Sequence, residues 1–271
     1  MRRVPYSAAM HRMDRVLNGL ANGNIEAITG TDADLCTRQN EDGTLGVRFR
    51  SETQDIVIKV EAYERFIRKN KAARKLMHFI MSQLRPGECK TEFYLSELID
   101  TGIISSDIRS ARRLLKQSMM LLEQILIYYV DQPPDDKNEA KMIKAWSIKH
   151  NAVLVVFSAY AIDMLWKADV WLRDDTWWIK DDEFTLLLYI EYMRERSRRK
   201  KAGFAISMKA ICKYMAVPSD GNKPADSCKR VIMGTIKSLE ATKFVKLTFE
   251  EIREFDRWYK DGKIEIGEKV K

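Results

Sequence analysis

Two segments of the chain carry arginine, lysine and serine at the spacing of one helix face, and these side chains bind the phosphates and base edges of DNA. On a wheel of about 100° per residue, the segment 106–122 turns the following residues away from its apolar side: Ser106, Arg109, Ser110, Arg113 and Lys116. The segment 227–240 does the same with Ser227, Arg230, Gly234 and Lys237, and Lys229 is a further candidate beside them. Both segments are therefore candidate DNA-reading helices, with a solvated charged face as the alternative.

The opposite side of each segment is apolar, as in an amphipathic helix packed on a core. The expected core residues are Ile108, Ala111, Leu115, Met119 and Leu122 in the first segment and Cys228, Ile232, Ile236 and Leu239 in the second. Ser105 or Ser106 is expected to cap the first helix, and Asp226 or Ser227 the second. Gly234 costs a helix roughly 1 kcal/mol relative to alanine. Close approach of a base or a backbone explains it, and drift or a contact within the chain explains it equally well.

A run of positive charge lies upstream of the second segment. The stretch 194–213 holds eight cations and one anion, which is +7 of a net charge of +8 in 271 residues. Such focusing favours a face that binds a polyanion over an indifferent basic surface. We expect phosphate contacts from Arg198, Arg199, Lys200 and Lys201.

Metal and enzyme signatures are missing from the sequence. The four cysteines form no CxxC pair, and the three histidines, His11, His78 and His150, stand in no ligand spacing. Asp32 and Asp34 have the spacing of a calcium loop, but Cys36 and Thr37 occupy positions that need a ligand and a glycine. There is no phosphate-binding GxxxxGK[ST], GxGxxG, GxSxG or HExxH motif. We expect no enzyme activity, no metal and no cofactor.

The N-terminal residues lack the continuous apolar stretch of a secretory leader. The longest apolar stretch, 152–162, is too short to cross a bilayer. Dispersed cysteines are typical of a reducing compartment. The sequence therefore predicts a soluble, cytoplasmic protein that does not bind membranes.

One element order occurs twice, about 112 positions apart: helix, short strand, helix, turn, basic helix, strand. The first copy begins at 71–84 and the second at 183–196. This order is that of a winged helix, and it predicts an α+β, mainly helical fold with two tandem winged-helix domains. The expected parts are an N-terminal extension at 1–65 with a helix at 8–20 and strands at 45–50 and 55–60, a first domain at 66–149, a connecting strand, helix and linker at 150–181, and a second domain at 182–271.

The wings are expected to be strand pairs that follow the basic helices. In the first domain they are 125–130 and 142–149, and in the second 244–249 and 263–267, with an extra helix between the latter two. The two tryptophans in 174–178 are expected to pack between the domains, with stacking on bases as the alternative.

Several motifs resemble the tandem winged-helix replication initiators of theta-replicating, repeat-bearing plasmids. They are Arg74-Lys75-Leu76-Met77, FYLSELI at 93–99, Phe157-Ser158, LLYIEYMRERS at 187–197 and KRVIMGTIKSLE at 229–240. The resemblance covers about 70–250. Residues 1–65 are unmatched, and 219–226 and 250–262 are unusual, which leaves a phage or integrated-element initiator open.

The resemblance implies binding to directly repeated origin sites on double-stranded DNA and local origin melting. It also implies dimers that repress, monomers that initiate, and recruitment of host replication proteins. The alternative is a transcriptional regulator or adaptor that uses one domain for DNA and the other for dimerisation, since Leu114, Met120 and Leu121 give the first basic helix surplus apolar surface. RNA binding is less favoured, because no stacking platform with interleaved aromatics is present.

Overall fold

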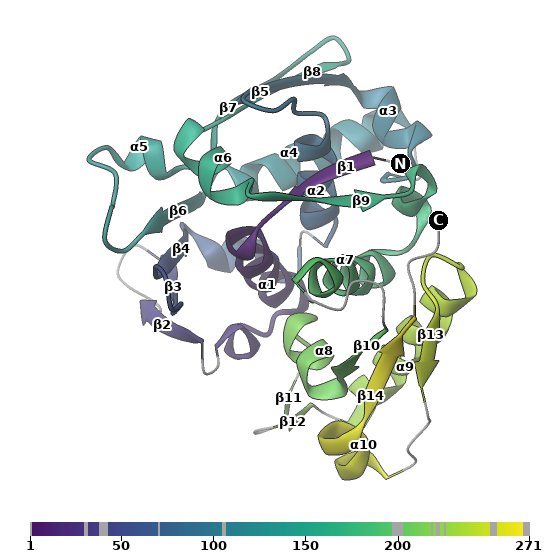
Figure 1. Ribbon diagram of the computed structural model, residues 1–271. Helices are drawn as coiled ribbons and strands as arrows, with labels where there is room; N and C mark the ends of the chain where they lie inside the picture. The colour runs from purple at the N-terminus through teal and green to yellow at the C-terminus, as the bar shows by residue number, and fades with distance from the viewer. Residues whose placement is uncertain are drawn as a thin grey trace.

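The computed structural model describes residues 2–29, 32–37, 43–69, 71–104, 107–196, 203–217, 219–220, 223–224, 226–249 and 254–267. Figure 1 shows α1 and α7 near the centre. The unit that contains the first basic helix lies above them in this view, and most of the unit that contains the second lies below. Each of the two units contains one three-stranded sheet, and a four-stranded sheet is formed mainly by strands from the N-terminal part of the chain.

The first winged-helix unit follows the expected element order. Its elements are α2 (Ala73–Ser82), β5 (Lys90–Tyr94), α3 (Leu95–Asp100), α4 (Ile108–Leu122), β7 (Ile143–Lys149) and β8 (Ala152–Phe157). The strands form an antiparallel sheet in the order β5-β8-β7, so the last strand along the chain lies in the middle.

The second unit repeats this arrangement. Its elements are α7 (Asp181–Arg196), β10 (Phe204–Ser207), α8 (Met208–Tyr214), α9 (Asp226–Ala241), β13 (Leu247–Phe249) and β14 (Lys263–Ile266). The sheet order β10-β14-β13 again places the last strand in the middle. The doubled pattern and the α+β, mainly helical fold are therefore confirmed, as is the extra helix α10 (Phe255–Asp261) between the second pair of wing strands.

The first wing does not use the strands that were expected. Strand β6 (Ile125–Tyr129) pairs with β4 (Ile56–Val60) and so extends the N-terminal sheet, whose order is β2-β3-β4-β6. The wing hairpin is instead β7 with β8, the strand that was expected to be a connector. Both 125–130 and 152–157 are apolar strands, and periodicity alone does not say which partner each one meets. The domain boundaries stay predictions, and these two strand pairings cross two of them.

The N-terminal part of the chain packs against the rest of the protein, because its first strand pairs with a strand of the connecting segment and β4 pairs with β6. Its elements are β1 (Arg2–Tyr6), α1 (Ala8–Asn22), η1 (Glu26–Ile28), β2 (Ala33–Thr37), β3 (Leu45–Phe49), β4 and η2 (Tyr63–Phe66). The expected helix and strand pair are confirmed, and β2 adds a third strand that pairs with β3. Ser7 accepts a hydrogen bond from the Met10 amide to start α1, and Gly23 ends it in the left-handed conformation.

Three elements connect the two units: α6 (Ala159–Leu165), β9 (Ala168–Leu172) and η3 (Asp174–Trp178). Helix α5 (Lys137–Ala140) lies between β6 and β7, and the short pair β11 (Ser219–Asp220) and β12 (Lys223–Pro224) lies between α8 and α9 of the second unit. Strand β9 pairs with β1, which ties the start of the chain to the connector. Trp177 is fully buried and packs edge-on against Phe79 of α2 and at a tilt against Phe184 of α7. Trp177 therefore packs between the units, as expected, whereas Trp178 is 62% exposed, so the expectation holds for one of the two tryptophans.

Candidate nucleic-acid interface

Helix α4 begins at an aspartate cap. The Oδ1 atom of Asp107 accepts hydrogen bonds from the amides of Arg109, at 2.8 Å, and Ser110, at 3.0 Å. The prediction of a Ser105 or Ser106 cap is therefore wrong, because Asp107 is an equally good capping residue one position closer to the helix. The Ser110 hydroxyl also donates to Asp107, at 3.2 Å, so this predicted DNA contact takes part in the cap.

The outward face of α4 carries the cations that were expected there. Arg109, Arg113 and Lys116 are exposed, while the expected core residues Ala111, Leu115, Met119 and Leu122 are buried. Ile108 was expected in the core and is 42% exposed, because the first residue of the helix extends beyond the packed part of the unit. Ser106 lies outside the described residues.

Arg112, which the sequence analysis did not single out, joins α4 to the wing. Its guanidinium donates to the His150 carbonyl and, at 3.3 Å, to Oδ1 of Asn151 in the turn between β7 and β8. His150 has a φ of 57°, a left-handed conformation that reverses the chain in this hairpin. The turn of the wing therefore holds a defined position beside α4, and strand β7 of the wing carries the exposed cations Lys144 and Lys149. No local sequence signal marks Arg112, since its partners lie 38 and 39 positions away.

Helix α9 shows the same division into two faces. The expected core residues Cys228, Ile232, Ile236 and Leu239 are all buried. On the other side Arg230, Gly234 and Lys237 are exposed. A Cβ built on Gly234 would meet nothing within 4 Å, so among the described residues no contact within the chain requires this glycine.

Two further candidates of the second unit are placed differently. Lys229 is half-buried, and its Nζ lies 6.0 Å from the ring centre of Trp258 in α10. The backbone of Ser227 belongs to α9, but its side chain is outside the described part of the structure.

The basic run divides among buried or half-buried, exposed and undescribed positions, and Arg196 and Lys209 are its exposed members within the described residues. Arg198, Arg199, Lys200 and Lys201 lie outside the described residues. Arg194 is buried, and its Nη1 donates to the Gly267 carbonyl at 2.9 Å. Arg196 donates to the hydroxyl of Tyr192, at 2.9 Å, and Lys213 pairs with Asp32, at 3.0 Å. Part of the charge counted in this stretch therefore serves the packing of the protein rather than an outer face.

Two basic residues of the Arg74-Lys75-Leu76-Met77 motif in α2 also make hydrogen bonds inside the protein. Arg74 and Lys75 are both buried. Arg74 donates to the Asp181 carbonyl, at 3.2 Å, and to the Thr185 hydroxyl, while Lys75 donates to the Ile179 carbonyl at 2.7 Å. Burial lowers the pKa of Lys75. These bonds connect α2 of the first unit to the start of α7 in the second, so they help to set the spacing of the two candidate DNA-reading helices.

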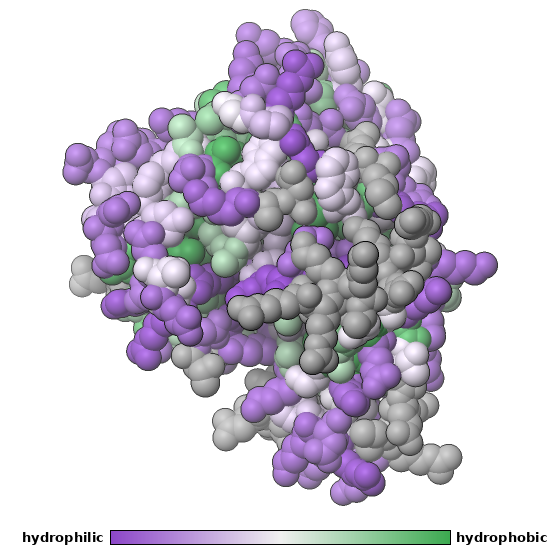
Figure 2. Space-filling model, viewed as in Figure 1, coloured by the Kyte–Doolittle hydropathy of each residue, from purple (hydrophilic) through white to green (hydrophobic). Residues whose placement is uncertain are grey.

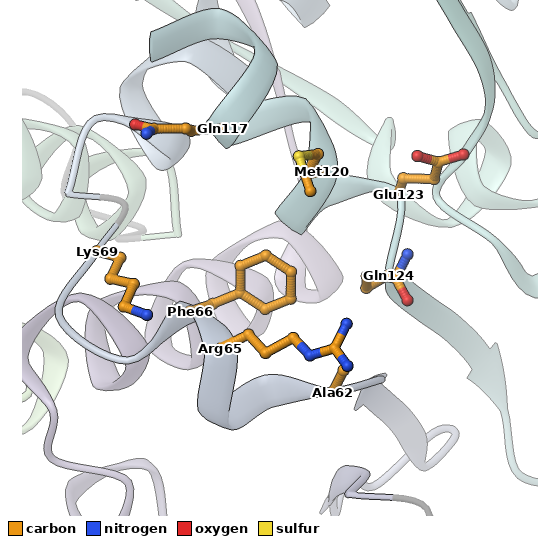
Figure 3. A pocket seen from close by; sticks show the side chains of 8 residues that line it. All are labelled: Ala62, Arg65, Phe66, Lys69, Gln117, Met120, Glu123 and Gln124. Carbon is orange, nitrogen blue, oxygen red and sulfur yellow. The ribbon is translucent and has the colours of Figure 1, made fainter. Parts of the chain in front are cut away.

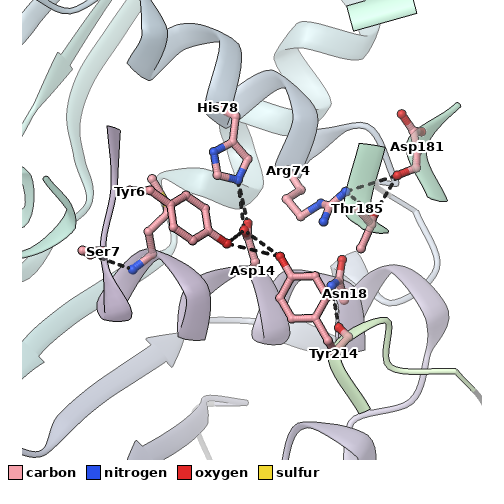
Figure 4. A network of polar contacts seen from close by, with 10 residues as sticks. Tyr6, Ser7, Asp14, Asn18, Arg74, His78, Asp181, Thr185 and Tyr214 are labelled. Carbon is pink, nitrogen blue, oxygen red and sulfur yellow. Dashed lines mark hydrogen bonds and ion pairs between the residues drawn. The ribbon is translucent and has the colours of Figure 1, made fainter. Parts of the chain in front are cut away.

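A buried polar cluster lies where α1 meets both units (Figure 4). The carboxylate of Asp14 accepts hydrogen bonds from the hydroxyls of Tyr6, at 2.7 Å, and Tyr214, at 3.1 Å, and its Oδ1 lies 2.9 Å from Nε2 of His78. Burial alone would raise the pKa of Asp14, but His78 and the neighbouring donors hold it below the ordinary value. Asn18 adds a bond to the Tyr214 carbonyl at 2.7 Å. Helix α1 is thus bonded to α2 on one side and α8 on the other.

Asp32 forms a second polar link between α1 and α8. It pairs with Arg15 of α1 at 2.7 Å and with Lys213 of α8 at 3.0 Å. Partial burial alone would raise the pKa of Asp32, but Arg15 and Lys213 lower it to about 2. The acidic residue that has calcium-loop spacing in the sequence therefore has two cations as partners. Within the described ranges, no three His, Cys, Asp or Glu side chains are grouped as a metal site requires.

A cavity of about 470 Å³ lies between the C-terminal half of α4 and the segment 62–69 (Figure 3). Met120, which is 55% exposed, faces Phe66 across it, and Arg65 and Lys69 stand at its edge. Leu121, part of the expected apolar surplus, is buried. Elsewhere the visible face of the molecule is mostly hydrophilic, with only small hydrophobic areas (Figure 2). In the described part of the chain, no helix is long and apolar enough to cross a membrane.

Comparisons with known proteins support the fold through structure and not through sequence. No protein-family model and no curated protein matches the sequence. The crystal structure of the Pi initiator protein in complex with iteron DNA is similar, with a TM-score of 0.52 and 13% identity over 72% of this chain and 89% of that one. Selenomethionine derivatives of domains 2 and 3 of RctB match with a TM-score of 0.51 and 13% identity, over 94% of this chain and 99% of that one.

A second structure of RctB domains 2 and 3 gives a TM-score of 0.51 and 12% identity, over 87% of this chain and 93% of that one. At such low identity these matches establish a shared fold, and they agree with the fold that the resemblance implied.

Proposed function

We propose that this protein is a non-enzymatic, sequence-specific double-stranded DNA-binding protein that initiates replication from repeated origin sites. The observation that carries the proposal is the repetition of one unit with the same sheet order, each unit presenting a helix with exposed cations opposite its core. A fold shared with an initiator protein that was crystallised with iteron DNA supports the same function. Cytoplasmic location, self-association as a dimer and recruitment of host replication proteins belong to this proposal.

In this proposal α4 and α9 enter successive major grooves. Arg109 and Arg113 of the first unit and Arg230 of the second contact base edges, while Lys116 and Lys237 contact phosphates. The wing adds Lys144 and Lys149 near the first groove. The bonds between α1, α2, α7 and α8 hold the units in one relative position, so the spacing of the two half-sites is set by the protein.

The test begins by selecting duplexes from a random pool and from the DNA around the gene. Affinity for the selected duplex and for random duplex is then measured by fluorescence anisotropy across a salt series. Sequence-specific binding persists at about 0.2 M salt, where binding through phosphates alone weakens steeply. Equal affinity for both duplexes that disappears with salt would refute the proposal.

Charge reversal separates the contributions of the two units. Arg113→Glu and Arg230→Glu should each weaken specific binding, since one good bidentate pair to a base is worth about 1–3 kcal/mol. Lys167→Glu is the matched control, because Lys167 is an exposed cation on another part of the surface and its pair with Asp163 is open to solvent. Footprints of the wild-type protein should cover two successive grooves.

A second candidate function is favoured by the cavity beside Met120. In a regulator or adaptor, the first unit would use this apolar surface for dimerisation and only the second would bind DNA. That function predicts a footprint over one groove, specific affinity that is unaffected by Arg113→Glu, and a change of oligomeric state on Met120→Glu.

A further inference from the structure

One aliphatic side chain of α9, that of Val231, is exposed to solvent. Val231 is 52% exposed, whereas Ile232, Met233, Ile236 and Leu239 of the same helix are buried. It follows Arg230 directly, lies at the edge of the exposed face on the helical wheel, and stands one turn before Gly234. A β-branched residue has no advantage in helix propensity. Neither packing nor propensity therefore explains valine at this position.

Gly234 keeps this valine uncovered. In an α-helix the side chain of a residue leans toward the N-terminus and covers the preceding turn. A side chain at position 234 would thus lie toward Arg230 and Val231. A Cβ at 234 would meet none of the described residues within 4 Å, so no described part of the chain requires the glycine. The arrangement leaves Arg230 and Val231 together on a bare surface between the N-terminal turn and Lys237.

We propose that Val231 contacts the C5-methyl group of a thymine next to the base read by Arg230, so that α9 reads one apolar and one polar feature of its site. The proposal rests on the proposed DNA-binding function. In the major groove only thymine presents a methyl group, and small apolar side chains recognise it. The exposed cation Arg230 directly precedes Val231, and the exposed Lys237 lies further along the same helix, which fits a polyanion rather than an apolar protein surface.

The first unit repeats the pairing. Ile108, at the start of α4, is 42% exposed and directly precedes the exposed Arg109. Each candidate DNA-reading helix therefore places an exposed β-branched residue next to an exposed arginine. This recurrence on both helices is expected if the aliphatic side chains contribute to recognition.

The experiment uses the full-length protein and the duplex selected as described above. Thymines are replaced one at a time by deoxyuridine, which removes only the methyl group. Affinities of wild type and Val231→Ala are measured by fluorescence anisotropy at one salt concentration. Trp171→Ala, which removes an exposed apolar side chain from β9, is the control. Thermal unfolding should show Val231→Ala as folded as wild type, because alanine is the better helix former.

The expected result is one thymine at which deoxyuridine weakens wild-type binding about fourfold, the factor that corresponds to about 0.8 kcal/mol for one methyl group. Val231→Ala should bind the thymine duplex more weakly by at least the same factor and be insensitive to deoxyuridine there. Trp171→Ala should behave as wild type. Specific binding with no deoxyuridine effect at any thymine, or an effect that persists in Val231→Ala, would overturn this inference and leave the proposed function standing. Failure to enrich any sequence would overturn both.

Discussion

The Nε2 atom of His78 lies 2.9 Å from Oδ1 and 3.1 Å from Oδ2 of Asp14, and both side chains are fully buried. Asp14 belongs to α1, and His78 belongs to α2 of the first unit. Tyr214 of α8 in the second unit donates to the same carboxylate at 3.1 Å. One buried carboxylate is therefore shared by the N-terminal helix and by both units, which makes it a determinant of how the units are arranged.

We expect Asp14→Ala to destabilise the protein by about 3 kcal/mol. The substitution leaves the hydroxyls of Tyr6 and Tyr214 and the ring of His78 without their acceptor in a buried site, and such losses are costly. Urea unfolding followed by circular dichroism measures the change. Asp163→Ala, which removes an exposed carboxylate paired with Lys167, should stay within about 0.5 kcal/mol of wild type. Similar losses for both variants would contradict the assignment.

His11 should make stability depend on pH between 7 and 5. Burial lowers the pKa of His11 to about 3, and its ring stacks on those of Tyr192 and Tyr214 with centroids 4.4 Å and 4.9 Å away. Below pH 6.5 the unfolded chain takes up a proton that the folded protein does not. The free energy of unfolding therefore falls, by about 2 kcal/mol from pH 7 to pH 5.

His11→Phe keeps an aromatic ring in this stack and removes the titration. Urea unfolding of wild type and variant at pH 7, 6 and 5 should show that wild type loses about 2 kcal/mol of stability relative to the variant as the pH falls. The lowered pKa of Asp14 affects stability only below the ordinary aspartate range, so it does not enter this window. A difference that is constant over these three pH values would show that His11 titrates normally in the folded protein.

The parts of the fold that depend on local periodicity were predicted well from the sequence. The apolar faces of α2, α4 and α9 follow directly from helical spacing, and α1, β3 and β4 were found in the same way. The pairing of β6 was missed because the apolar pattern of a strand is local, whereas its partner is distant. Ile125 of β6 pairs with Val60 of β4, which lies 65 positions earlier in the chain. Strand pairing depends on the tertiary fold.

The candidate site was predicted unevenly for a related reason. Exposed cations at regular spacing, such as Arg113 and Arg230, are visible on a helical wheel. Arg194 and Lys75 look equally basic in the sequence, yet both are buried, because carbonyl groups far along the chain accept their hydrogen bonds. Charge counts therefore overstate the surface charge wherever tertiary partners exist.

Arg112→Ala should loosen the wing without unfolding the unit. The variant loses the guanidinium bonds to the turn at His150 and Asn151 but keeps the buried side of α4 intact. We expect faster amide hydrogen exchange in the turn, because this tether is gone. We also expect weaker binding to the selected duplex, because the wing no longer presents its lysines in one position. Arg112→Lys should restore only part of both, since lysine lacks the planar fork of arginine.

A matched control for this variant is Arg109→Ala, which removes an exposed cation from the same helix. Its turn amides should exchange as in wild type while its DNA affinity falls. Unchanged exchange at 150–151 in Arg112→Ala would show that the hairpin holds its position without α4.

Gly234→Ala should raise stability and lower specific affinity at the same time. The added Cβ meets no described residue within 4 Å, so alanine should stabilise α9 by about 0.4–1 kcal/mol. The same methyl group stands where we propose that a base pair approaches, so affinity for the selected duplex should fall while affinity for random duplex is unchanged. Gly19→Ala in α1 is the contrasting variant, because its Cβ would lie 2.5 Å from the Ile28 side chain and should destabilise the protein. If Gly234→Ala gained stability and kept its full specific affinity, no base would approach α9 at this position.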